Sequence, residues 1–246
     1  MTRVAVSGAA GRMGRMAAET VAAAADLDLS GAFDPAASGE AIAGVPIVVE
    51  PAEIDCDVVI EFTIPEVVMD NLEQWGKRGF HAVVGTSGFS ADRLEQLAVV
   101  WGDSPGNCLV VPNFSVGAVM MMRFAELAAP HFAGVEVIEL HHGDKPDAPS
   151  GTALATASRI AAAGGRNDAV PGGSGADIAG IPVHSVRLPG IIASQEVIYG
   201  GRGETMTIRH DTFSREAFMP GMLAAVRAVA GLPDKLTVGL DSVLGI

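Results

Sequence analysis

The stretch Val4-Ala5-Val6-Ser7-Gly8-Ala9-Ala10-Gly11-Arg12-Met13-Gly14-Arg15 decides the fold of the first part of the chain. An apolar β-branched run leads into a glycine-spaced turn and then a helical pattern, an arrangement that binds a dinucleotide pyrophosphate at a helix N-terminus. Gly8 permits the tight turn, Gly11 lets main-chain amides approach the phosphates, and Gly14 allows close helix–strand packing. The spacing is G-x-x-G-x-x-G rather than the commoner G-x-G-x-x-G, so a merely structural turn is the alternative.

Outward from this stretch, short β-branched runs alternate with helical patterns. We expect strands at 3–7, 27–33, 45–49, 57–62, 81–84 and 108–112, and helices at 12–25, 65–78 and 91–101. Such alternation predicts βαβ units and a parallel sheet.

The rhythm changes from residue 113. We expect helices at 116–131, 151–163 and 215–230, and strands at 135–142, 183–188, 195–200 and 205–210. The glycine-rich segment 164–175 predicts a loop or a lid. The fold class is therefore α/β, with a Rossmann-type dinucleotide-binding domain followed by an α+β domain that has a mixed sheet.

Composition limits the possible partners. The chain has 246 residues, 49% hydrophobic and 18% charged, which is typical of a globular protein. A net charge of −13 disfavours nucleic acid and an anionic membrane surface. No apolar run is long enough for a membrane span, and no basic segment precedes the first strand. Two cysteines, Cys56 and Cys108, form no disulfide framework, so we expect a cytoplasmic protein.

A carboxylate stands at the end of the second expected strand. Asp34 lies 26 residues after Gly8, where it can accept hydrogen bonds from an adenosine ribose and repel a 2′-phosphate. We therefore expect NADH to be used at least as well as NADPH, although Arg12 is able to reach a 2′-phosphate. The alternative is that Asp34 only starts a turn before Pro35.

Further expected strands end in segments suited to a cofactor. Ligands bind at the carboxyl ends of parallel strands in open α/β sheets. The segments 61–63, 85–88 and 111–114 all lie at such ends, and Asn113 offers a side chain that can bond a carboxamide. Each segment alone is as well explained as an ordinary loop.

The segment 139–153 holds the densest chemistry. His141, His142 and Lys145 follow a predicted strand, and Gly151 and Thr152 begin a predicted helix whose amides suit a carboxylate. Histidine and lysine are the side chains needed to exchange protons and to hold a dianionic substrate during hydride reduction. A polar surface loop is the alternative. A metal site is disfavoured because no cysteine accompanies the histidines and Lys145 repels a cation.

This segment resembles the dihydrodipicolinate reductase family, also called 4-hydroxy-tetrahydrodipicolinate reductases. The family motif E-x-H-H-x-H-K-x-D-A-P-S-G-T-A matches residues 139–153 except at Asp144, where a third histidine is usual. The similarity also covers 4–14, 61–65, 85–89, 113–117 and 180–188, and so spans essentially the whole chain.

The resemblance implies reduction of 4-hydroxy-tetrahydrodipicolinate to tetrahydrodipicolinate with NADH or NADPH, in lysine and diaminopimelate biosynthesis. It makes His141 the proton donor/acceptor and Lys145 the proton donor, with the substrate held by His142, Gly151 and Thr152. The implied cofactor contacts are Gly8, Ala9, Ala10, Gly11, Arg12, Met13, Asp34, Gly85, Thr86, Ser87, Val111, Pro112, Asn113 and Phe114.

The resemblance also implies a domain division and an assembly. Residues 1–112 and 220–246 would form the dinucleotide-binding domain, and 113–219 a substrate-binding and oligomerisation domain. The family works as a cytoplasmic homotetramer built through the sheet of the second domain.

Three departures and two other functions are weighed against this reading. Asp144 removes a cation-capable side chain near the carboxylates, while Glu61 and Ser87 replace the usual Asp and Thr. A nucleotide sensor without catalysis would need a broken cluster, whereas His141 and Lys145 both stand. An acyl-forming aldehyde dehydrogenase needs an activated cysteine near a histidine, which neither cysteine of this chain offers in sequence.

Overall fold

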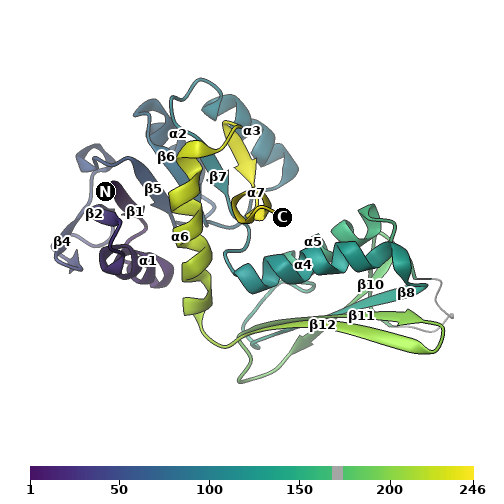
Figure 1. Ribbon diagram of the computed structural model, residues 1–246. Coiled ribbons are helices and arrows are strands. Elements are labelled where there is room, and N and C mark those ends of the chain that lie inside the picture. The colour runs from purple at the N-terminus through teal and green to yellow at the C-terminus, as the bar shows by residue number, and fades with distance from the viewer. Residues whose placement is uncertain (168–173) are drawn as a thin grey trace. The chain divides into compact units, whose positions relative to one another are not determined.

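The computed structural model describes residues 1–167 and 174–246, which form two compact units (Figure 1). Unit 1 consists of residues 1–114 and 218–246, and unit 2 of residues 115–217. The expected domain boundaries, after residues 112 and 219, differ from these by two residues. Of the segment 164–175, expected to be a loop or lid, residues 168–173 lie outside the described part of the chain.

Unit 1 is built on an eight-stranded sheet with the order β13-β7-β6-β5-β1-β2-β4-β3. Its strands are β1 (Thr2–Ser7), β2 (Leu27–Phe33), β3 (Ala41–Ile42), β4 (Val45–Val48), β5 (Val58–Glu61), β6 (His81–Val84), β7 (Cys108–Val110) and β13 (Leu236–Val238). Every neighbouring pair is parallel except β3 and β4. The predicted α/β fold with a parallel sheet is therefore confirmed.

The apolar character of these strands follows from burial on both faces. The helices of unit 1 are α1 (Arg12–Ala23), α2 (Val68–Lys77), α3 (Ala91–Trp101), α6 (Met219–Ala228) and the short α7 (Asp241–Leu244). Trp75 of α2 and Trp101 of α3 are fully buried against a cluster that contains Val59, Ala82 and Val110. Parallel strands covered in this way read as continuous apolar runs.

The end of the chain returns to unit 1. Helix α6 contacts α1, and β13 pairs in parallel with β7 at the edge of the sheet (Figure 1). The Asn107 side chain fixes the turn between them by donating to the carbonyls of Val229 and Leu232 at 3.1 and 3.0 Å. The sequence pattern predicts only a tail after residue 230, because a three-residue strand is too short to show alternation.

Unit 2 has a five-stranded sheet with the order β12-β11-β8-β10-β9. The strands are β8 (Gly134–His141), β9 (Ala176–Ile178), β10 (Ile181–Arg187), β11 (Ala193–Gly201) and β12 (Glu204–Thr212). Only β8 and β10 are parallel, so the sheet is mixed, as predicted. Helices α4 (Val116–Ala128) and α5 (Gly151–Ala162) cover one face (Figure 1).

Some element ends differ from the expected ones for local reasons. Helix α2 begins at Val68 rather than residue 65, because the chain first makes a turn in which the Val67 amide donates to the Ile64 carbonyl. The helix expected at 215–230 is α6 flanked by two single 3₁₀ turns, Arg215–Phe218 and Val229–Gly231. In the described part of the chain, no helix is long and apolar enough to cross a membrane.

Replacement of Gly14 by alanine tests how tightly α1 packs on the strand before it. A Cβ at Gly14 would lie 2.0 Å from the Gly8 carbonyl oxygen, a main-chain atom that has no room to move away. Gly14→Ala should lower the free energy of unfolding by about 1–3 kcal/mol in urea denaturation, the usual cost of overpacking. Gly231→Ala is the matched control, because nothing lies within 4 Å of its added Cβ. Equal stability of the two variants would contradict the packing described here.

Candidate active site

The carboxyl edge of the unit 1 sheet gathers the residues expected to bind a nucleotide. Phe33, Ser7, Glu61, Val84 and Val110 are in register across five neighbouring strands. The residues that follow this row are Asp34, Gly8, Phe62, Gly85 and Val111. Segments far apart in the sequence therefore meet at one edge of one sheet, which is where open α/β sheets bind ligands.

The glycine turn leaves no room for side chains. Gly8 has a φ of +78°, and a Cβ there would lie 2.3 Å from the Phe62 carbonyl oxygen. Helix α1 begins after Gly11, which has no side chain to cap it, and no acidic residue stands in its first turn. The first amides of a helix lack intrahelical partners and carry the positive end of its dipole. This cradle fits a pyrophosphate.

Asp34 lies against the same turn. Its Oδ2 accepts a hydrogen bond from the Ala10 amide at 3.1 Å, and its Oδ1 accepts one from the Ala36 amide at 3.0 Å. The carboxylate thus forms the turn that the sequence offered as an alternative, while the contact with Ala10 places it beside the nucleotide cradle. Arg12 is exposed at the start of α1, and Arg15 donates to the Ala10 carbonyl at 3.0 Å.

Glu61 has a structural role, because its carboxylate is buried and does not face a ligand site. Its fully buried carboxylate accepts hydrogen bonds from Asn71 Nδ2 at 3.0 Å, Trp75 Nε1 at 2.9 Å and Thr63 Oγ1 at 2.5 Å. Burial raises the pKa of Glu61 above its ordinary value. Glu61 therefore ties α2 to the loop after β5 from beneath the sheet edge.

The segments after β6 and β7 pack against one another. A Cβ at Gly85 would lie 2.2 Å from the Phe62 ring and 2.6 Å from the Phe114 ring, so ring packing alone requires glycine there. The buried Thr86 hydroxyl accepts from the Thr63 amide at 3.0 Å. Of the other expected contacts, Ser87 and Pro112 are exposed, Asn113 is half-buried, and Val111 and Phe114 are buried.

The second group of expected site residues lies in unit 2, where β8 ends and α5 begins. His141 is the last residue of β8, and Lys145 Nζ pairs with Asp147 Oδ1 at 2.7 Å. The Lys145 amide donates to the His142 carbonyl at 3.3 Å, a turn that leaves Asp144 exposed. The hydrogen bond from Lys145, helped by its positive charge, lowers the pKa of Asp147.

The N-terminus of α5 is arranged to receive an anion. Ser150 caps the helix by accepting from the Ala153 amide at 3.2 Å. Gly151 and Thr152 are the first two helical residues, no acidic side chain stands in this turn, and the space beside the Gly151 Cα is open. Their amides and the helix dipole suit a carboxylate.

Two residues that the sequence analysis did not assign complete this cluster. Glu139 has no exposed surface and accepts a bidentate pair from Arg187, at 2.8 Å from Nη2 and 3.0 Å from Nη1. His141 Nδ1 lies 2.5 Å from Glu139 Oε2, the oxygen that also accepts from Arg187 Nη1. Arg187 Nη2 also donates to the Asp147 carbonyl at 2.6 Å, which joins the strands to the loop of Lys145. The signal was present: Val135, Val137 and Glu139 occupy one buried face of β8, where a charged residue needs a partner.

Contacts among the side chains of this cluster shift the pKa values of Glu139 and His141. Burial is the largest influence on Glu139 and would raise its pKa, but hydrogen bonds from Arg187, Ser185 and His141 together lower it below the ordinary value. Burial also lowers the pKa of His141, and Lys145 and Arg187 add to this effect against the opposing influence of Glu139. His141 is therefore neutral near pH 7, with an ionised glutamate beside Nδ1.

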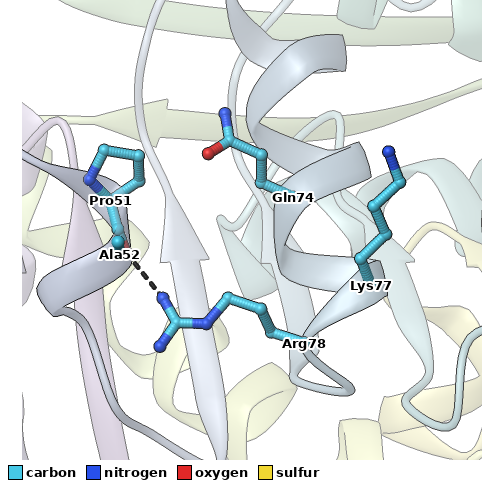
Figure 2. Close-up of a pocket in the computed structure, with 5 residues that line it drawn as sticks. All are labelled: Pro51, Ala52, Gln74, Lys77 and Arg78. Carbon is cyan, nitrogen blue, oxygen red and sulfur yellow. Dashed lines mark hydrogen bonds between the residues drawn. The ribbon is translucent and has the colours of Figure 1, made fainter.

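Two alternatives to this cluster are a metal site and a hollow in unit 1. Within residues 1–167 and 174–246, no three His, Cys, Asp or Glu side chains are grouped to hold a metal ion. A hollow of about 320 Å³ is lined by Pro51, Ala52, Gln74, Lys77 and Arg78 (Figure 2). Its Arg78 donates to the Pro51 carbonyl at 2.6 Å, as the dashed line shows. None of the expected site residues lines this hollow.

Comparison with known proteins gives matches along nearly the whole chain. The model for the N-terminus of dihydrodipicolinate reductase matches residues 2–114, and the model for its C-terminus matches residues 117–244. The chain is 47% identical over 257 residues to the 4-hydroxy-tetrahydrodipicolinate reductase of Thermobifida fusca (strain YX), covering 100% of both. It is 47% identical over 253 residues to the enzyme of that name from Mycobacterium marinum (strain ATCC BAA-535 / M), covering 99% of both.

A solved structure agrees with these matches. Dihydrodipicolinate reductase from Paenisporosarcina sp. TG-14, with dipicolinate bound, is 36% identical and superposes with a TM-score of 0.85. The match covers 98% of this chain and 99% of that chain.

Proposed function

The chain belongs to the dihydrodipicolinate reductase family, and from this premise we propose that it reduces 4-hydroxy-tetrahydrodipicolinate to tetrahydrodipicolinate with NADH or NADPH, in lysine and diaminopimelate biosynthesis. The observation that carries the proposal is the cluster at the end of β8, where the charge of Lys145 acts on the His141 imidazole and the same segment leads into the N-terminus of α5. A dicarboxylate, dipicolinate, is bound in the related structure at 36% identity.

Unit 1 is the nucleotide-binding part of this proposal. The first amides of α1 would hold the pyrophosphate, beside Gly8 and Gly11, which have no side chains. Asp34 would accept hydrogen bonds from the adenosine ribose. The remaining contacts are Ala9, Ala10, Arg12, Met13, Gly85, Thr86, Ser87, Val111, Pro112, Asn113 and Phe114. When bound, the nicotinamide supplies a hydride to the substrate.

Unit 2 holds the substrate. Its carboxylates bind the amides of Gly151 and Thr152, with His142 and the Lys145 ammonium as further anchors. These local positive groups are needed because the chain as a whole carries a net charge of −13. The exposed Asp144 stands where relatives usually have histidine, so one cation-capable group fewer faces the carboxylates.

His141 and Lys145 manage protons during the reduction. The substrate loses water, and the unsaturated ring then gains one hydride and one proton. Lys145 Nζ gives the proton, while the neutral imidazole of His141 exchanges protons near pH 7. The contact between Lys145 and Asp147 holds the ammonium beside the loop that leads to α5.

Substitutions at the two proton-handling residues test the assignment. Lys145→Ala and His141→Gln should each lower turnover about 10²–10⁴-fold, the usual contribution of general acid–base groups. The nucleotide dissociation constant should stay unchanged, because the cradle lies in unit 1. Turnover is followed as NADH oxidation with freshly formed 4-hydroxy-tetrahydrodipicolinate.

Exposed residues of the same types serve as controls, namely Lys77→Ala and His131→Gln. Wild-type turnover in Lys145→Ala or His141→Gln would overturn the role given to that residue. A wild-type chain that does not oxidise NADH with this substrate would overturn the proposed function itself.

Asp34 governs the choice between the two nucleotides. NADH should be used at least as well as NADPH, because the 2′-phosphate of NADPH meets the Asp34 carboxylate beside Ala10. Asp34→Asn keeps an oxygen for the Ala10 amide and removes the charge. It should therefore raise kcat/KM for NADPH relative to NADH by about tenfold, which corresponds to about 1.4 kcal/mol. Asp28→Asn, at an exposed position near the start of the strand that Asp34 follows, is the control, and an unchanged ratio in Asp34→Asn would contradict this role.

The proposal includes a cytoplasmic homotetramer that binds neither nucleic acid nor membrane. Helices α4 and α5 cover one face of the unit 2 sheet, and the other face presents Ile138, Leu140 and Ile198, which are only partly buried. Sedimentation equilibrium should give about 100 kDa, four times 25.1 kDa. Ile198→Arg should shift the mass toward smaller species, and a wild-type mass of about 25 kDa would contradict the assembly.

A further inference from the structure

The buried face of β8 carries a carboxylate that the proposed reaction does not itself use. Residues 139 and 141 lie two positions apart on one strand, so their side chains share a face. Arg187 is the register partner of His141 on the parallel strand β10 and reaches back to both oxygens of Glu139. The three side chains therefore form a fixed chain from guanidinium through carboxylate to imidazole.

The contact with Glu139 decides which ring nitrogen of His141 carries its proton. Ionised carboxylate oxygens only accept hydrogen bonds, so a nitrogen at 2.5 Å from one must be the donor. In the neutral ring the proton then sits on Nδ1, and Nε2 holds the lone pair. Arg187 supports this state because its charge balances that of Glu139, so the carboxylate does not draw a second proton onto the imidazole.

We propose that Glu139, anchored by Arg187, is a positioning residue that keeps the proton of neutral His141 on Nδ1 and so makes Nε2 the atom that exchanges a proton with the substrate. The inference deepens the proposed function and rests on it, because it gives His141 a chemical task. It assigns Glu139 no contact with substrate.

The charged side chains that act on His141 lie on three elements. Glu139 lies on β8, Arg187 on β10, and Lys145 and Asp147 on the loop before α5. The positions packed beside Glu139 on β11 and α5 are Gln195 and Thr156, which are uncharged and bonded to each other at 2.7 Å. The balance between Glu139 and Arg187 is therefore the part of this environment that substitution can tilt in either direction.

Two single substitutions should move the titration of His141 in opposite directions. Glu139→Gln removes the anion and leaves the guanidinium, which disfavours the imidazolium and lowers the pKa of His141. Arg187→Gln removes the cation and leaves the anion, which favours the imidazolium and raises the pKa. Each shift should be about one pH unit, the usual size for the loss of a nearby charge. The pKa is read by NMR on chains labelled at histidine ¹³Cε1, with His141→Gln to assign the signal.

The dependence of kcat/KM on pH gives the second readout. The part of the pH profile that reflects the titration of His141 should shift to lower pH in Glu139→Gln and to higher pH in Arg187→Gln. These shifts should agree with the NMR pKa values. A purely structural role would lower activity without opposite displacements. Glu136→Gln is the matched control for the NMR titration, because Glu136 bonds His184 at 2.9 Å on the opposite face of the same strand. It should leave the His141 pKa unchanged.

A double variant separates an effect on His141 from misfolding of a single variant. Arg187→Gln leaves a carboxylate buried without its main partner, whereas Glu139→Gln/Arg187→Gln removes both charges. The double variant should show a His141 pKa between those of the two single variants. A His141 pKa that does not differ among Glu139→Gln, the double variant and wild type would overturn the inference. NMR shifts without any shift of the pH profile of kcat/KM would overturn it too, whereas a wild-type chain without reductase activity would instead contradict the proposed function.

Discussion

The buried ion pair between Glu139 and Arg187 is the contact on which the proposed catalytic cluster depends. A carboxylate with no exposed surface is compatible with folding only when its charge is matched and its oxygens are bonded. Arg187 meets both needs, and its further contact with the Asp147 carbonyl fixes the loop that presents Lys145. One pair thus joins β8, β10 and that loop, and it places the His141 imidazole beside a defined acceptor.

In unit 1, the site residues are held in place by a different physical means. Its nucleotide edge is shaped by close approach of main-chain atoms, which only glycine allows at Gly8 and Gly14. The carboxylate of Glu61 lies beneath this edge and is satisfied by neutral donors, so burial raises its pKa, whereas cationic Arg187 keeps that of Glu139 low. The pKa values of the two buried glutamates are therefore shifted in opposite directions because their partners differ. Neutral donors suffice where a loop must only be held, and a cation is needed where an ionised acceptor must face a histidine.

Much of this architecture could be predicted from the sequence, because the signals were local. The apolar runs of β1 and β6 and the glycine spacing after β1 predict a parallel sheet with a nucleotide edge, and the strand pairing confirms the parallel sheet. The strand β13 was not predicted, because three residues are too few to show an alternating pattern of polar and apolar side chains. Gly85 was expected to contact the cofactor, and the rings of Phe62 and Phe114 give a separate reason for glycine there. Arg187 was missed because its partner is 48 positions away in the sequence and only the pairing of β8 with β10 brings them together.

A double-mutant cycle on kcat/KM tests most directly whether Glu139 acts through His141. The cycle compares Glu139→Gln in the wild-type chain with the same substitution in a chain that already carries His141→Gln. If the carboxylate works by positioning the imidazole, its removal should lower kcat/KM strongly in the first case and hardly at all in the second. Equal losses in both chains would show that Glu139 and His141 act independently and would contradict the account.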